Sequence, residues 1–301
     1  MAERVIIFDC DPGWDDAIAL ILALASGHAP IIAITTVFGN GPVVETTLNA
    51  RRIATACRRP DLAVYRGCDR SLSGNCGQPP KHAATSAVLA ALSANGKIDE
   101  MHAVDFMIEA AQRYGHRLTI VATAPLSNLA TAFKRNPAAM TAVGQLVVMG
   151  GTLGLGNVTE HAEFNLFADP QAAKIVLTAA IPKVLIPSET CDLLPADLDF
   201  VRRLRAIRGE LPRLVAELVG ERLALNNGEA VPAYDVLAAL FVIARGIFAL
   251  RQGAIDVEAQ DKLRLGKLYF APGAQDANGE LAVSVDTESA YSLIYDVLKR
   301  A

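Results

Sequence analysis

The sequence predicts an α/β protein with a mainly parallel central sheet flanked by helices, an open sheet of the Rossmann-like kind. Short apolar runs alternate along the chain with longer helical stretches, which is the pattern of repeated β-α units. Hydrophobic residues make up 52% and charged residues 20% of the 301 residues, a composition that supports a large core and excludes disorder. No linker, repeat or low-complexity tract divides the chain, so we predict one domain over residues 1–301.

The first predicted strand is the short apolar run Val5 to Phe8, typical of a parallel strand buried on both faces. Asp15 to Ser26 is apolar nearly all round and is followed by Gly27, which predicts a buried helix. Ile31 to Val37 predicts the second strand. The next expected elements are a Gly39-Asn40-Gly41-Pro42 turn, a helix through about Ala56, a strand over Leu62 to Tyr65 and a mobile loop over Arg66 to Pro80.

The middle of the chain continues the alternation, with helices between strands. The strands expected there are Leu118 to Thr123, Gln145 to Met149 and Lys183 to Ile186. A loop covers Gly150 to Phe164, and Asp169 caps a helix that has Pro170 at its first position. Residues 188–250 are mostly helical, and short strands near Ile255, Leu268 and Leu281 precede a C-terminal helix. A parallel sheet binds its ligands at the carboxyl ends of its strands.

The composition argues against several classes of partner. The net charge is -4, there is no long basic run, and aromatic residues are only 6%, which disfavours nucleic-acid binding. The longest apolar stretch, Ala17 to Ala25, is shorter than the roughly 18 residues of a membrane span, and Asp9 and Asp11 interrupt any signal peptide. Five scattered cysteines without a CxxC pair are typical of reduced thiols, so we expect a cytoplasmic protein.

Four carboxylates follow the first strand closely, in Asp9-Cys10-Asp11-Pro12-Gly13-Trp14-Asp15-Asp16. Helix capping accounts for one or two of them, because an Asp near a helix N-terminus accepts hydrogen bonds from free N–H groups. Acids so close together raise one another's pKa unless a cation neutralises them. The Pro-Gly turn can direct several carboxylates at one place, and oxygen donors select a hard ion, Ca²⁺ or Mg²⁺. The pattern therefore predicts a metal site.

The same block resembles the N-terminal signature of the inosine-uridine nucleoside hydrolases. Further matches follow in the family's order over nearly the whole chain. They are Thr36-Val37-Phe38-Gly39-Asn40, Ala124-Pro125-Leu126-Ser127-Asn128, Gly150-Gly151, Asn157, Glu163-Phe164-Asn165, Asp169-Pro170 and Asp235. The first block and the Glu-Phe-Asn block are specific, whereas Gly39-Asn40 alone is also a common turn sequence.

The resemblance implies that the chain hydrolyses the N-glycosidic bond of ribonucleosides to ribose and free base, with tightly bound Ca²⁺, as a homodimer or homotetramer. It implies that Asp11 is both the general base for the attacking water and a calcium ligand, and that Asn40 supports the network that binds the ribose hydroxyls. The other implied calcium ligands are the carboxylates of Asp16 and Asp235 and the backbone carbonyl of Ser127. The implied ribose ligands are Asp15, Asn157, Glu163 and Asn165.

One position departs from the family pattern. Tyr234 stands before Asp235 where the best-known members have a histidine that protonates the departing base, and a tyrosine of ordinary pKa near 10 is a poor acid. The resemblance also places His82 near a second active-site histidine of the family, as a substrate-binding residue, and His161 lies between Asn157 and Glu163, from where it can reach the pocket. An aromatic wall for the base is expected from Trp14, Phe164, Phe167 and Tyr234. Because such stacking suits purines, which accept a proton at N7, we expect purine nucleosides to be preferred.

Two other functions account for part of the same pattern. A haloacid-dehalogenase-like phosphohydrolase would use Asp9 as nucleophile and Asp11 as acid, but that class wants Thr or Val where Gly13 stands. It also gives no role to Glu163-Phe164-Asn165. A calcium-dependent nucleoside- or ribose-binding protein without catalysis would keep every ribose and metal residue, and only turnover distinguishes it from the hydrolase.

Overall fold

The computed structural model describes residues 4–73 and 86–301. Within them, ten strands form one sheet in the order β11-β10-β12-β7-β6-β5-β1-β2-β3-β4. The strands of this sheet are β1 (Val5–Cys10), β2 (Ile31–Thr36), β3 (Ala63–Arg66), β4 (Ile98–Asp99), β5 (Leu118–Ala122), β6 (Gln145–Met149), β7 (Lys183–Ile186), β10 (Phe248–Val257), β11 (Leu268–Pro272) and β12 (Gly279–Val285).

The sheet is parallel from β4 to β12, and only β10 runs antiparallel to its neighbours β11 and β12. This confirms the predicted α/β class with a mainly parallel sheet. A separate short pair joins β8 (Pro195–Ala196) to β9 (Val231–Pro232). The predicted strands 145–149 and 183–186 have the bounds that the structure gives them, and the others differ at their ends by one or two residues or, near the C-terminus, are longer.

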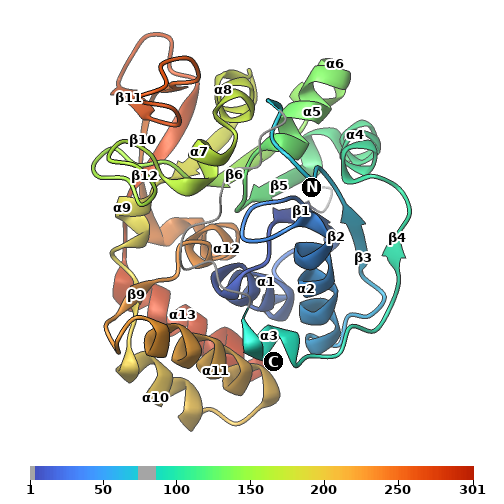
Figure 1. Cartoon of the computed structure of the whole chain (residues 1–301), viewed down its shortest axis with the longest axis vertical. Coiled ribbons are helices and arrows are strands. Elements are labelled where there is room, and N and C mark those ends of the chain that lie inside the picture. Colours follow the sequence, from blue (N-terminus) through green and yellow to red (C-terminus); the bar gives the residue numbers. More distant parts are fainter. Residues whose placement is uncertain (1–3, 74–85) are drawn as a thin grey trace.

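Helices cover both faces of the sheet (Figure 1). They are α1 (Trp14–Ser26), α2 (Val43–Ala56), α3 (Ala87–Ala90), α4 (Ala103–Tyr114), α5 (Ser127–Arg135), α6 (Pro137–Thr141), α7 (Phe164–Ala168), α8 (Pro170–Thr178), α9 (Ser188–Cys191), α10 (Leu198–Ala206), α11 (Glu210–Leu225), α12 (Val236–Ile243) and α13 (Thr287–Arg300). Within the described ranges, no helix is both long and apolar enough to cross a bilayer.

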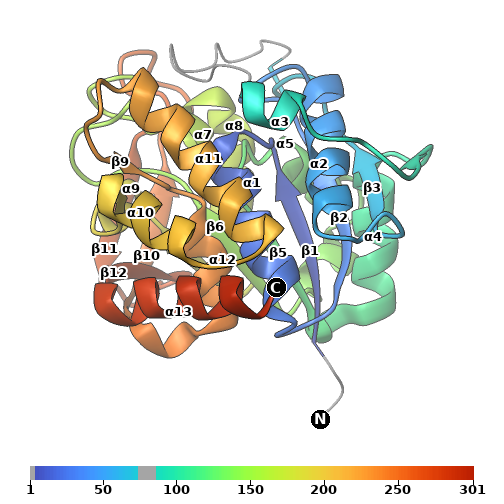
Figure 2. The same cartoon turned by 90° about the horizontal axis from the view of Figure 1, so that it is seen from below.

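The two faces of the sheet build two apolar cores. Ile6 and Phe8 of β1 pack with α1, α2 and α12, whereas Val5 and Ile7 pack with α4, α5 and α8 on the other face, as the alternation of strand side chains requires. Figure 2 shows α10, α11 and α13 as an outer layer beyond α1. Because β1 lies between β5 and β2, the loops that follow these central strands meet at one edge of the sheet.

Candidate active site

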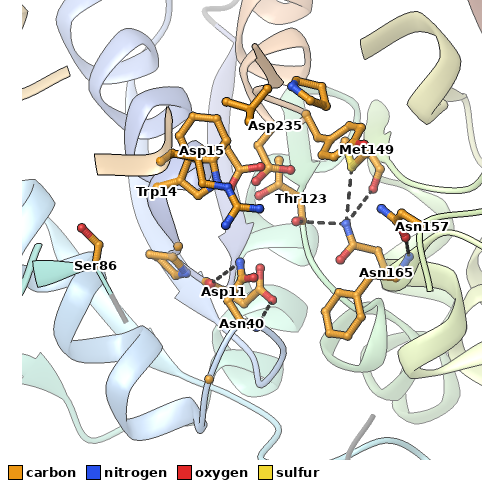
Figure 3. Close-up of a pocket in the computed structure, with 18 of the residues that line it drawn as sticks. Asp11, Trp14, Asp15, Asn40, Ser86, Thr123, Met149, Asn157, Asn165 and Asp235 are labelled. Carbon is orange, nitrogen blue, oxygen red and sulfur yellow. Dashed lines mark hydrogen bonds between the residues drawn. The ribbon is translucent and has the colours of Figure 1, made fainter. Parts of the chain in front are cut away.

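A cavity of about 300 Å³ lies at the carboxyl ends of the central strands. The loops after β1, β2 and β5 contribute Asp11, Asn40 and Thr123, and β6 contributes Met149. Figure 3 shows the carboxylates of Asp11, Asp15 and Asp235 on one side of this cavity, with the amides of Asn157 and Asn165 on the other. The cavity therefore collects residues from both ends of the sequence at the edge where a parallel sheet binds its ligands.

The first feature of the cavity is an acidic cluster of Asp11, Asp15, Asp16 and Asp235. Asp11 follows β1, Asp15 and Asp16 lie in the first turn of α1, and Asp235 immediately precedes α12. One carboxylate oxygen each from Asp15, Asp16 and Asp235 lie within 4.8 Å of one another. The segment between β1 and α1 thus directs several carboxylates at one place, as predicted. Asp15, which was expected among the ribose ligands, lies within the group of carboxylates that could hold a metal.

Asn40 links two members of the acidic cluster. Its backbone N–H donates to Asp11 Oδ2 over 2.7 Å, and its side-chain amide donates to the Asp11 carbonyl and to Asp16 Oδ2 over 3.1 and 3.2 Å. A Cβ at Gly39 would lie 1.8 Å from Asp11 Oδ2, so the preceding position accepts only glycine while Asp11 keeps this place. The Gly39-Asn40 turn therefore holds the carboxylate of Asp11 as well as turning the chain.

Burial and mutual repulsion dominate the electrostatics of the cluster. Burial, and then the charge of Asp16, raise the pKa of Asp11 and of Asp235 well above the ordinary aspartate value, and the same two causes raise the pKa of Asp15 to about 7. Burial also raises the pKa of Asp16, opposed by hydrogen bonds that include the one from Thr123 Oγ1, 2.7 Å from Asp16 Oδ1. A divalent cation would favour the ionised carboxylates, and an all-oxygen donor set fits a hard ion.

The fourth acid of the sequence block lies outside this arrangement. Asp9 is fully buried in β1, and its Oδ1 accepts hydrogen bonds from Thr35 Oγ1 and Asn128 Nδ2 over 2.8 and 2.9 Å. Burial raises the pKa of Asp9 to about 7. Asp9 lies inside β1, whereas Asp11 lies in the loop after it, and the hydrogen bonds of Asp9 join β1 to β2 and α5.

The structure does not bring Ser127 to the cavity. Ser127 begins α5, is buried, and donates its hydroxyl to Asp169 Oδ2 over 2.6 Å. The cavity-lining residue at this strand end is Thr123, directly after β5, and its carbonyl accepts a hydrogen bond from Asn165 Nδ2 over 3.2 Å. Sequence reasoning missed Thr123, although the residue that follows a buried parallel strand is the one whose carbonyl reaches the ligand-binding edge.

The wall opposite the acidic cluster comes from the loop before α7 and from its first turn. Glu163 caps α7: Oε1 accepts from Asn165 N and Oε2 from Gly151 N, both over 2.8 Å. Burial raises the pKa of Glu163, while these backbone N–H groups oppose the shift. Asn157 Oδ1 accepts from Phe164 N over 2.9 Å. Glu163, Phe164, Asn165 and Asn157, all predicted for substrate binding, therefore line the cavity together.

The other predicted residues differ in whether they line the cavity. Trp14 and Tyr234 line the cavity, and burial raises the pKa of the Tyr234 phenol, which makes it a still weaker acid. Phe167 and His161 are not among the lining residues, because Phe167 lies beyond the first turn of α7 and His161 lies in the preceding loop. His82, and residues 74–80 of the predicted mobile loop, fall outside the described residues.

Arg222 is a further lining residue that the sequence prediction did not include. Arg222, on α11, reaches the cavity and places its guanidinium carbon 6.0 Å from the centroid of the Trp14 ring. It is the one Arg or Lys side chain among the described residues that line this cavity. No local pattern distinguishes Arg222 from Arg213, the other arginine of α11, and only the packing of α11 against α1 brings Arg222 to the cavity.

Comparison with known proteins agrees with this geometry. The family described as "Inosine-uridine preferring nucleoside hydrolase" matches residues 6–292. The chain is 31% identical over 319 residues to the "Pyrimidine-specific ribonucleoside hydrolase RihA" of Salmonella schwarzengrund, with 98% of each chain covered. It is 28% identical over 308 residues to the "Inosine-uridine preferring nucleoside hydrolase" of Crithidia fasciculata, covering 99% of this chain and 98% of that one.

Solved structures share the fold. The plant nucleoside hydrolase PpNRh1 matches with a TM-score of 0.90 and 25% identity, covering 99% of both chains. The purine-preferring ribonucleoside hydrolase from Gardnerella vaginalis matches with a TM-score of 0.86 and 23% identity, covering 99% of this chain and 100% of that one, a likeness of fold alone. The chain therefore belongs to the inosine-uridine preferring nucleoside hydrolase family and is a nucleoside hydrolase, an N-glycosidase.

Proposed function

We propose that this enzyme hydrolyses ribonucleosides to ribose and free base in a calcium-dependent reaction, with water as the attacking nucleophile. The observation that carries the proposal is the convergence of Asp11, Asp15 and Asp235, with Asp16 beside them, on one side of a cavity whose other side presents Asn157, Glu163 and Asn165. The amides and carboxylates around the cavity offer both donors and acceptors to ribose hydroxyls.

The proposed calcium ligands are the acidic cluster and a backbone carbonyl. Asp15, Asp16 and Asp235 supply the grouped carboxylate oxygens, Asp11 is held beside them by Asn40, and Thr123 takes the carbonyl role first expected for Ser127. When bound, Ca²⁺ would lower the pKa of water and bind the ribose hydroxyls. The choice of Ca²⁺ over Mg²⁺ is supported by family membership.

The chain's own residues then perform the acid–base and electrostatic work. Asp11 accepts the proton of the attacking water, and its orientation is fixed by the N–H of Asn40, 2.7 Å away. Cleavage of a ribosyl C–N bond passes through an oxocarbenium-like state, as in glycoside hydrolysis. The anionic side chains of Asp15 and Glu163 stabilise the positive charge that develops on the ring.

We propose a preference for purine nucleosides. Trp14, Phe164 and Tyr234 offer aromatic surface to the base, and purines accept a proton at N7 before the bond breaks. The similarity to a protein named pyrimidine-specific makes this preference a sharp question for experiment. A uridine kcat/KM above that of every purine nucleoside would refute it and would point to an acid elsewhere, with His82 and His161 the first to replace.

The test is release of reducing sugar from a panel of ribonucleosides, with and without a chelator. We expect ribose from inosine, loss of activity on calcium removal and recovery when calcium is restored. Asp276→Asn, an exposed change in the loop between β11 and β12, is the matched control and keeps full activity. Absence of sugar release from every ribonucleoside by the calcium-loaded protein would overturn the proposal, and tight nucleoside binding without turnover would identify a binding protein instead.

A further inference from the structure

The charges around the cavity are distributed unevenly. Asp11, Asp15, Asp235 and Glu163 bring carboxylates to the cavity, and Arg222 brings the positive charge of a guanidinium from α11. Arg222 lies close enough to Asp15 for their charges to interact, and its guanidinium carbon is 6.0 Å from the Trp14 ring centroid. This distance is within the range of a cation–π contact. A cation therefore lies between the acidic cluster and the aromatic surface proposed for the base.

The position of Arg222 is set by its helix. Leu218, Val219 and Leu223 of α11 are buried in the core, and the residues three and four positions before Arg222 lie on the same side of the helix. The adjacent Glu221 accepts hydrogen bonds from Ser86 Oγ and from Ala87 N, the latter over 2.7 Å, which fixes α11 to the start of α3. The guanidinium thus extends from a rigid element that is anchored at both the core and the cavity rim.

The departing base needs a group that stabilises negative charge. When the C1′–N bond breaks, its electron pair goes to the base, so negative charge develops on a ring nitrogen and on conjugated oxygens. Tyr234 is poorly suited to neutralise that charge by proton transfer, because a phenol of ordinary pKa near 10 is a poor acid. A guanidinium stays protonated and offers five N–H donors, so it stabilises an anion by hydrogen bonds and charge without giving up a proton.

We propose that Arg222 is a catalytic residue that stabilises the departing base, a role that rests on the proposed hydrolysis. Its N–H groups donate to an oxygen or ring nitrogen of the base as the C1′–N bond breaks. Water oxygen forms the new bond to C1′, Asp11 takes the water proton, and solvent protonates the released base anion. Arg222 touches only the base in this scheme, so its contribution depends on how poor the leaving group is.

The test compares leaving groups in Arg222→Gln and Arg222→Lys. The substrates are inosine, uridine and p-nitrophenyl β-D-ribofuranoside, whose nitrophenolate departs without help. We expect Arg222→Gln to lower kcat for the nucleosides by about 10²-fold, the usual effect of one lost charge-stabilising donor. The p-nitrophenyl riboside should lose less than about threefold, which also shows that the variant is folded. Lysine keeps the charge and should restore part of the nucleoside activity.

The control is Arg213→Gln, on the same helix but with its side chain 71% exposed, and all three substrates should be unaffected by it. Equal losses on nucleosides and on the nitrophenyl riboside would overturn the inference, since Arg222 would then act on the ribose side through Asp15. Unchanged nucleoside turnover in Arg222→Gln would overturn it as well. Failure of the unmodified protein on every substrate would instead refute the proposed function itself, so the two failures are distinguishable.

Discussion

The acidic cluster and the surface proposed for the base are built differently. The acidic cluster comes largely from one short block after β1, and its members are held by hydrogen bonds to Asn40, Gly13 and Thr123. The base wall, which we define as Trp14, Arg222 and Tyr234, is assembled from α1, α11 and the segment before α12. The side chains of the acidic cluster are fixed by these hydrogen bonds and serve the cleavage of the C1′–N bond. The side chains of the base wall can differ without changing the positions of those acids. We expect changes in the cluster to stop the reaction and changes in the wall to alter substrate choice.

Removing a metal ligand tests the cluster most severely. Asp16→Ala should lower calcium affinity and reduce turnover to background, because Asp16 contacts Asn40 and Thr123 and lies among the grouped carboxylates. Calorimetric calcium titration and the reducing-sugar assay measure the two effects. Active protein that contains no alkaline-earth metal by elemental analysis would contradict this prediction.

Loss of one ribose hydroxyl should have the next largest effect. A site built to bond a hydroxyl rejects a substrate that lacks it by about 10⁴-fold, because its buried polar groups are left unpaired. We therefore expect kcat/KM for inosine to exceed that for 2′-deoxyinosine by about this factor. The ratio should survive in Arg222→Gln, since that change lies in the base wall. Similar values for the two nucleosides would remove Asp15, Glu163 and Asn165 from the ribose site.

Replacing the general base should leave binding intact. In Asp11→Asn the side chain keeps its size but loses its proton affinity, and we expect kcat to fall by at least about 10²-fold. Competitive binding of ribose or of a slow substrate analogue should change little. A kcat within a few-fold of the unmodified enzyme, with Asp276→Asn as reference, would show that another group takes the water proton.

The smallest effect is expected in the base wall. Tyr234→Phe removes only the phenol oxygen, and because burial raises the pKa of that phenol we expect it to orient and stack rather than to protonate. A lost general acid costs about 10²–10⁴-fold in kcat, so the loss here should remain below that range. A drop of 10³-fold on inosine with full activity on p-nitrophenyl riboside would show that Tyr234 is the acid.

The sequence predicted most of the fold and the acidic cluster, and the reasons are local. Buried parallel strands such as Gln145–Met149 are continuous apolar runs, and the block after β1 places three of the four clustered acids within a few residues. The antiparallel β10–β12 pairing was not predicted, since the direction of short strands depends on the connections between them. Arg222 was missed because it reaches the cavity through packing between elements far apart in the chain, whereas Thr123 had a local signal, its place directly after β5.

Asp235 completes the acidic cluster from a distant part of the chain, and this affects how the chain folds. Asp16 lies near the beginning of the chain and Asp235 in its last quarter, on helices α1 and α12 that pack together. A cation held between them cross-links segments that are remote in sequence, and it binds only after both have taken their places. Ligand that binds only the folded chain adds about 2.7 kcal/mol of apparent stability at a concentration 100 times its Kd. Calcium depletion should therefore lower the melting temperature and make the C-terminal helices the first to exchange their amide protons.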